Sequence, residues 1–159
     1  MGNNWKITDT LTKVFADEVP DGQGSIRLST LHRETVSCVI AYFGAADWGR
    51  YWKVSVKAPE KIETRLRRVE LVPSAYPCHK EQDDNYLRIV PGMYPDLLRD
   101  LDTEDDGADK KYLTKEVPGQ WRSLWLDVTV DAELAGGDYA IVIETETEDG
   151  EKETLKADL

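Results

Sequence analysis

The feature that most constrains the fold is a two-residue alternation of apolar and polar side chains. It is clearest from Ser123 to Val130 and recurs in short segments along most of the chain. Successive side chains of a β-strand point to opposite faces, so this alternation predicts a strand with one buried face. In this segment the apolar set expected to face the core is Leu124, Leu126, Val128 and Val130.

The same pattern predicts about eight or nine short strands, separated by turn-forming residues. The sequence Glu148-Asp-Gly-Glu151 predicts a hairpin, because Asp-Gly accepts the backbone of tight turns. Helical periodicity is weak, and the best helical candidate is a short turn over residues 94–101, with Pro95 near its start. The other predicted strands are residues 7–11 or 11–15, 25–31, Thr35–Phe43, Tyr51–Lys57, 66–72, 86–89, 139–143 and 155–159.

Many short strands without helices between them indicate an all-β chain in which two antiparallel sheets form an immunoglobulin-like β-sandwich. The length of 159 residues is that of one domain, so residues 1–159 are expected to form a single β-sandwich domain. The apolar fraction of 40% is typical of a folded globular protein.

The acidic balance of the chain argues against two classes of partner. A net charge of −11 repels the phosphates of nucleic acids and the head groups of anionic lipids. We therefore expect no nucleic-acid partner and no membrane partner. The first residues carry no basic segment followed by an apolar one, so no signal peptide is predicted. Localisation in the cytoplasm and secretion both stay open.

The residues that usually carry catalysis or bind metals form no recognisable pattern. His32 and His79 are the only histidines, and the sequence contains no nucleophile elbow, phosphate loop or zinc-protease motif. We expect no catalytic residue, no metal and no cofactor in this chain. Cys38 lies in an apolar run and Cys78 in a predicted loop, which favours two free thiols, although a disulfide between them stays open.

The acidic stretch over residues 100–111 resembles a calcium loop only in part. Asp102, Glu104 and Asp106 stand at the first, third and fifth positions of an EF-hand loop, and Gly107 at the sixth. The twelfth position is Leu113, where the loop requires a bidentate glutamate. The sequence therefore favours a solvated surface loop without an apolar anchor.

Tryptophans are the most conspicuous binding candidates. Trp52 falls on the apolar face of its predicted strand and is expected in the core, whereas Trp125 falls opposite the core residues and is expected to project outward. Trp48 lies in a predicted loop, and Trp121 precedes a predicted strand. Exposed aromatic rings can stack on sugars or pack against another domain. Both interpretations stay open for Trp48, Trp121 and Trp125.

Four short motifs follow one another along the chain: Arg33-Glu-Thr-Val-Ser37, Tyr94-Pro-Asp-Leu-Leu98, Trp125-Leu-Asp-Val-Thr-Val130 and Ala135-Gly-Gly-Asp-Tyr139. Together they resemble the N-terminal domain of glycoside hydrolase family 123-like proteins. The similarity covers residues 11–159, and it departs from the family pattern at Gly136-Gly137, where Ala or Pro followed by a single Gly is expected.

The resemblance implies an accessory β-sandwich that precedes a (β/α)-barrel acting on N-acetylgalactosaminides. In that family the catalytic Asp-Glu pair lies in the barrel, so no catalytic residue carries over to this chain. The implied partner is a C-terminal catalytic barrel domain in a longer parent chain. A stand-alone carbohydrate-binding module and an immunoglobulin-like domain that binds proteins remain the alternatives.

Tyr94 and Asp96 are further candidates, in a rigid segment that could lean on such a barrel. This interpretation requires both residues to lie near the C-terminal residue, where the barrel would be attached. Exposed, coplanar tryptophan rings in a groove would favour sugar binding, and an apolar patch near Leu159 would favour docking of a domain.

Overall fold

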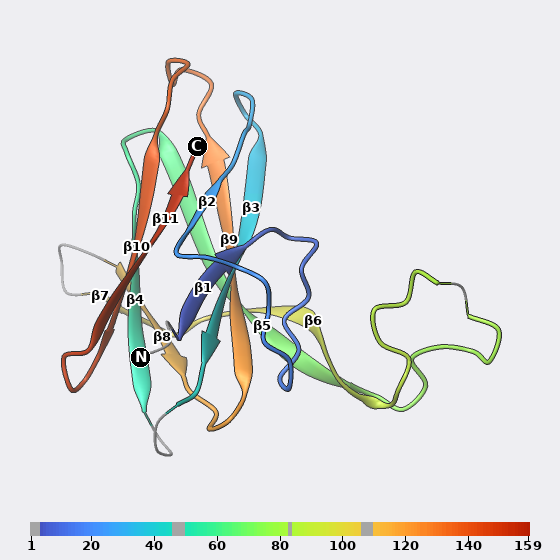
Figure 1. Ribbon diagram of the computed structural model, residues 1–159. Helices are drawn as coiled ribbons and strands as arrows, with labels where there is room; N and C mark the ends of the chain where they lie inside the picture. The colour runs from blue at the N-terminus through green and yellow to red at the C-terminus, as the bar shows by residue number, and fades with distance from the viewer. Residues whose placement is uncertain (1–3, 46–49, 83, 106–109) are drawn as a thin grey trace.

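A computed structural model describes residues 4–45, 50–82, 84–105 and 110–159, and within them two β-sheets face each other (Figure 1). One sheet has five strands, in the order β1 (Trp5–Thr8), β3 (Thr35–Phe43), β9 (Trp121–Val130), β5 (Ile62–Ser74) and β6 (Gly92–Asp100). The other has six strands, in the order β2 (Ser25–Arg27), β11 (Lys152–Asp158), β10 (Ala140–Thr147), β4 (Tyr51–Lys57), β8 (Lys110–Lys115) and β7 (Thr103–Asp105).

This arrangement confirms the predicted β-sandwich. All neighbouring strands are antiparallel except β2 and β11, which run parallel. The described part of the chain has eleven strands in place of eight or nine, and it contains no helix, hence none that could span a membrane. Three of the eleven strands, β1, β2 and β7, have only three or four residues, which are too few to show a clear alternation in the sequence.

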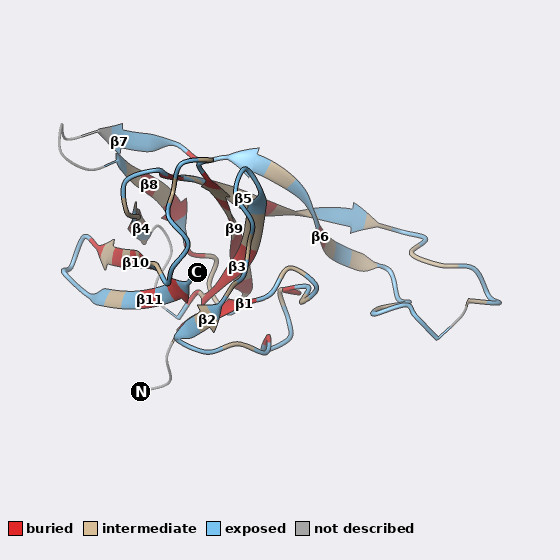
Figure 2. Ribbon diagram, turned by 90° about the horizontal axis from the view of Figure 1, so that it is seen from above, coloured by how far each residue is buried: buried red, intermediate tan, exposed pale blue. Residues whose placement is uncertain are grey.

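The core lies between the two sheets, where Figure 2 shows the buried residues. As predicted, the alternate residues Leu124, Leu126 and Val128 of β9 are fully buried there. At one side of the core the Trp5 ring stacks on Tyr42 with 4.8 Å between centroids, and it meets Trp52 edge-on at 5.1 Å. Trp52 is 1% exposed, which confirms its predicted place in the core.

Two predictions for residues 86–101 are wrong. Residues 86–89 belong to a loop, and residues 94–98, expected to begin a helical turn, lie in the edge strand β6. Pro95 is the residue that suggested the turn. An edge strand tolerates a proline, and β6 is such a strand because it pairs with β5 on one side only. A β-bulge next to Pro95 leaves Asp96 without a residue opposite it on β5.

The acidic stretch also differs from the expectation of a loop without an apolar anchor. Leu101 is 9% exposed and belongs to the main core, and the residues around it form β7 and the start of β8. The buried Leu101 side chain and the pairing of β7 with β8 together attach this stretch to the sandwich. By contrast, the Asp149-Gly150 hairpin is confirmed, and Gly150 adopts a φ of +82° there.

Candidate functional site

The most distinctive surface feature is a β-hairpin that projects from the sandwich (Figure 1). We call residues 71–97 the arm: they comprise the outer ends of β5 and β6 and the loop that joins them. Of the twelve large apolar residues that are exposed in the described part of the chain, eight lie in the arm. They are Val72, Tyr76, Tyr86, Leu87, Ile89, Val90, Met93 and Leu97.

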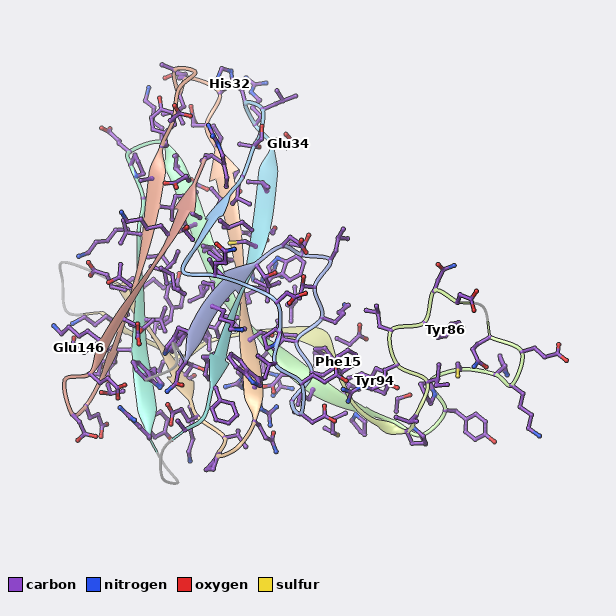
Figure 3. The ribbon with its side chains drawn as sticks, in the orientation of Figure 1. Phe15, His32, Glu34, Tyr86, Tyr94 and Glu146 are labelled. Atoms are coloured by element: carbon purple, nitrogen blue, oxygen red, sulfur yellow. The ribbon has the colours of Figure 1, made fainter. Side chains whose placement is uncertain are left out.

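A groove of about 510 Å³ lies at the base of the arm and is called the arm groove below. Its walls come from three parts of the chain that are distant in sequence: the N-terminal segment, both strands of the hairpin and the loop between them. Figure 3 shows Phe15 and Tyr94 beside each other at this base, with Tyr86 farther out along the loop. The rings of Phe15 and Tyr94 meet edge-on, 5.7 Å apart.

Arg88 connects the arm to the N-terminal segment. Its guanidinium lies 3.9 Å from the centre of the Phe15 ring, and it forms ion pairs with Asp17 at 2.8 Å and with Glu18. The hydrogen bond from Arg88 lowers the pKa of the Asp17 carboxyl. The Tyr94 hydroxyl donates to the carbonyl of Val90 at 2.6 Å. These contacts fix two walls of the groove relative to each other.

Two charged side chains of the groove have no partner within the described part of the chain. Lys13 comes from the N-terminal segment and Asp96 from the bulge of β6, and neither forms a hydrogen bond or an ion pair there. The nearby Arg88, in contrast, is engaged by two carboxylates. Lys13 and Asp96 are therefore free to bind a ligand.

The two tryptophan candidates that the structure describes, Trp121 and Trp125, do not form a sugar platform. Trp121 is 7% exposed and lies under the N-terminal segment, in a small cluster with Val14, Val39 and Ala41. Trp125 does project from the outer face of the sheet, as predicted, but it packs against this cluster and is only half-exposed. Trp48 lies outside the described residues.

Trp125 is also held by its own strand. Its indole N–H donates to Asp127 at 2.7 Å, and the same carboxylate accepts from Ser37 at 2.7 Å and pairs with Arg67. Burial alone would raise the pKa of Asp127, but the hydrogen bonds from Ser37, Trp125 and Arg67 outweigh it and lower the pKa. This carboxylate therefore remains ionised and organises the outer face of the sheet.

The end of the sandwich near Leu159 carries a second, smaller groove, of about 240 Å³. We call it the C-terminal groove; Leu28, Leu134, Tyr139 and Leu159 are among the residues that line it. Leu31, in the adjacent loop, is 76% exposed. Arg27, Ser29, Thr30, His32 and Asp138 line the groove as well, so its surface is mixed, and the apolar part expected for docking of a domain is confined to the residues named above.

Tyr94 and Asp96 do not meet the requirement of lying near the C-terminal residue. Ile62 pairs with Val130, which lines the C-terminal groove, whereas Val72, at the far end of the same strand, pairs with Tyr94. The ten residue steps between Ile62 and Val72 span roughly 33 Å at the usual rise of a strand. Figure 3 likewise shows Tyr94 far from His32, which lies at the C-terminal end. The two grooves are thus separate sites.

The remaining chemical candidates form no reactive site among the described residues. Glu104 of the acidic stretch is paired with Lys53 at 2.8 Å, and no three metal-binding side chains come together in the described ranges; Asp106 and Gly107 lie outside these ranges. Both cysteines are free, as predicted. Burial raises the pKa of the Cys38 thiol to about 12, with a smaller contribution from Asp127, so this thiol is unreactive at neutral pH.

Sequence reasoning found Tyr94 and Asp96 but missed the residues that complete the arm groove. Phe15, Tyr86 and Arg88 come from segments that were predicted as strands and carry no motif. A possible signal was the density of prolines between Pro73 and Pro95, which is unusual for paired strands.

The sequence matches no protein-family model and no curated protein. Its fold is similar to part of a family 123 glycoside hydrolase from Clostridium perfringens, studied for glycolipid glycan hydrolysis. The TM-score is 0.62 at 9% identity, over 97% of this chain and 26% of the hydrolase. The collagen-binding subdomain of the Enterococcus faecalis surface protein ACE gives a TM-score of 0.47 at 7% identity, over 84% of this chain and 92% of the subdomain.

The first similarity shows a shared fold and does not show a shared function, because the identity is only 9%. This chain spans about a quarter of the length of the hydrolase.

Proposed function

We propose that this chain is a non-catalytic β-sandwich domain of a longer, glycosidase-like protein, packed against a (β/α)-barrel that acts on N-acetylgalactosaminides. The observation that carries the proposal is the similarity of nearly the whole chain to one quarter of a family 123 glycoside hydrolase. The four sequence motifs that resemble the N-terminal domain of this family point to the same proposal, while the sequence as a whole matches no family model.

The contact with the barrel is proposed at the C-terminal groove. A domain joined after Leu159 would start beside this groove, whereas the arm lies roughly 33 Å away along β5. Leu31 is 76% exposed at this end, and burying a leucine side chain contributes about 1.5–3 kcal/mol to an interface. A partner domain that covers Leu31 would therefore stabilise the contact by removing this side chain from water.

The test uses the complete product of the gene and, beside it, the 159-residue chain. The complete product should hydrolyse 4-nitrophenyl N-acetyl-β-galactosaminide, and the 159-residue chain should not. Leu31→Asp in the complete product should lower its melting temperature, because the aspartate would lose its hydration at the domain contact. In the isolated chain the same substitution should leave the melting temperature nearly unchanged.

Leu11→Asp is the matched control, because Leu11 is 85% exposed and lies in the N-terminal segment, away from the C-terminal groove. The proposal is wrong if the gene encodes no further domain. The proposed contact is wrong if Leu31→Asp and Leu11→Asp have the same effect in the complete product.

A further inference from the structure

We infer that the arm groove is a binding site for a neutral saccharide. The groove of about 510 Å³ falls within the range of about 300–1,000 Å³ that is usual for small-molecule sites. It is not part of the contact proposed for the barrel, and the inference does not rest on that contact.

Six of the thirteen residues that line the groove have ring-bearing side chains. These rings are rigid, so they lose little conformational entropy when a ligand covers them. Tyr86 is 47% exposed, whereas the Tyr94 ring is fixed by Phe15 and by the bond from its hydroxyl to Val90. The ring-bearing residues are Phe15, Pro73, Pro77, Tyr86, Tyr94 and Pro95.

A sugar residue matches this surface because one side of its ring carries C–H groups and its edge carries hydroxyl groups. The C–H side can lie on an aromatic or proline ring, and the hydroxyls can reach polar groups at the rim. Two such groups are available in Lys13 and Asp96, which have no partner in the described part of the chain. Ser74 also lines the groove.

The charges at the rim select a neutral ligand. Lys13 and Asp96 contribute one positive and one negative charge, and Arg88 is already paired with Asp17 and Glu18. An anionic ligand would be attracted by Lys13 and repelled by Asp96. A cationic ligand would be attracted by Asp96 and repelled by Lys13. A hydroxyl group can donate to the carboxylate and also accept from the ammonium group, so a neutral polyhydroxy ligand satisfies both.

A bound peptide fits the groove less well. The N–H and C=O groups of β5 and β6 lie in the plane of the hairpin, where they pair with each other or point to its edges, so the face of the hairpin offers a peptide few backbone partners. Prolines at 73, 77 and 95 have no N–H to donate. The polar groups of a peptide would then be left unsatisfied, at a cost in affinity.

The test is titration of the ¹⁵N-labelled 159-residue chain with methyl N-acetyl-β-galactosaminide and with N,N′-diacetylchitobiose, followed by NMR. At least one of them should shift resonances of residues 72–77, 85–88 and 94–96, with a dissociation constant on the order of 1 mM for a small, open site. Tyr86→Ala should weaken binding about tenfold through loss of the exposed ring. Asp96→Asn, which removes the charge but keeps the shape, should weaken it several-fold.

Tyr76→Ala and Asp84→Asn are matched controls, because both residues are exposed in the same loop but do not line the groove. Neither should change the affinity. The inference is overturned if neither saccharide shifts these resonances at 20 mM, or if Tyr76→Ala weakens binding as much as Tyr86→Ala. It is equally overturned if an oligoproline peptide binds in the groove and the saccharides do not.

Discussion

Asp127 offers the sharpest test of how the outer face of the five-stranded sheet is held together. Its carboxylate accepts hydrogen bonds from Ser37 and Trp125 and pairs with Arg67, whose side chain is 21% exposed. In Asp127→Asn the remaining amide oxygen can still accept from Ser37 and Trp125. The amide NH₂ then faces the guanidinium of Arg67, so the charge-assisted bond is lost.

A hydrogen bond to a charged group contributes about 1.5–3 kcal/mol, so Asp127→Asn should destabilise the domain by about 2 kcal/mol at pH 7. For a domain of 159 residues this corresponds to a fall in melting temperature of about 6 °C, since the entropy of unfolding is about 2.1 cal/mol/K per residue. The measurement is thermal unfolding followed by circular dichroism. Glu63→Gln, an exposed acid on the neighbouring strand β5, is the control and should change the melting temperature little.

The dependence on pH gives the same prediction a second readout. The pKa of Asp127 is lowered in the folded state from an ordinary value of 3.8. Its ionised form therefore contributes stability that is fully present above pH 3.8 and is lost as the pH falls through the folded-state pKa. The difference between wild type and Asp127→Asn should shrink toward pH 2. The reasoning would be refuted if wild type and Asp127→Asn differed in melting temperature by the same amount at pH 7 and pH 2. It would also be refuted if Asp127→Asn lowered the melting temperature by less than 2 °C at pH 7.

Three other substitutions or reactions test the fold directly. Gly44→Ala should destabilise the domain by about 3 kcal/mol in urea unfolding, because the added Cβ would lie 2.2 Å from the carbonyl oxygen of Val117. Leu126→Ala should cost about 2–5 kcal/mol in the same assay, because Leu126 is fully buried. At pH 8 a thiol reagent should modify the half-exposed Cys78 and leave the folded chain's Cys38 unmodified, because the raised pKa keeps Cys38 protonated; two equally fast reactions would contradict this burial.

The sandwich could be predicted from sequence because its central strands follow the alternation rule closely. In β9 the residues at alternate positions are buried one after another, and β4 and β10 repeat the pattern. In β3 five consecutive residues are buried, because Val39 and Ala41 on its outer face pack with Val14 and Trp121. Burial of one face is a local consequence of strand geometry, so the local sequence contains enough information. The short edge strands lack that signal because three residues cannot show a period.

The arm groove could not be predicted because it depends on contacts between distant segments. Phe15 and Tyr94 meet although 79 positions of sequence separate them (94 − 15), and Arg88 reaches Asp17 from a loop. Neither contact has a periodic or spacing signal. The expectation that Tyr94 and Asp96 lie near the C-terminal residue was wrong for the same reason. Their distance from that residue depends on how β5 and β6 pair, and the motif alone carries no information about this pairing.

The separation of the two grooves makes the two proposals compatible. The arm groove and the C-terminal groove share no lining residue, and roughly 33 Å of β5 lies between them, so a domain in contact with Leu159 need not contact the saccharide site. A saccharide held by Tyr86 and Asp96 would then sit well away from the docking end. In a longer glycosidase-like protein the arm would bind a part of the glycan other than the residue being hydrolysed. Asp96→Asn should therefore raise the KM for an extended glycan and leave kcat for a simple nitrophenyl glycoside unchanged.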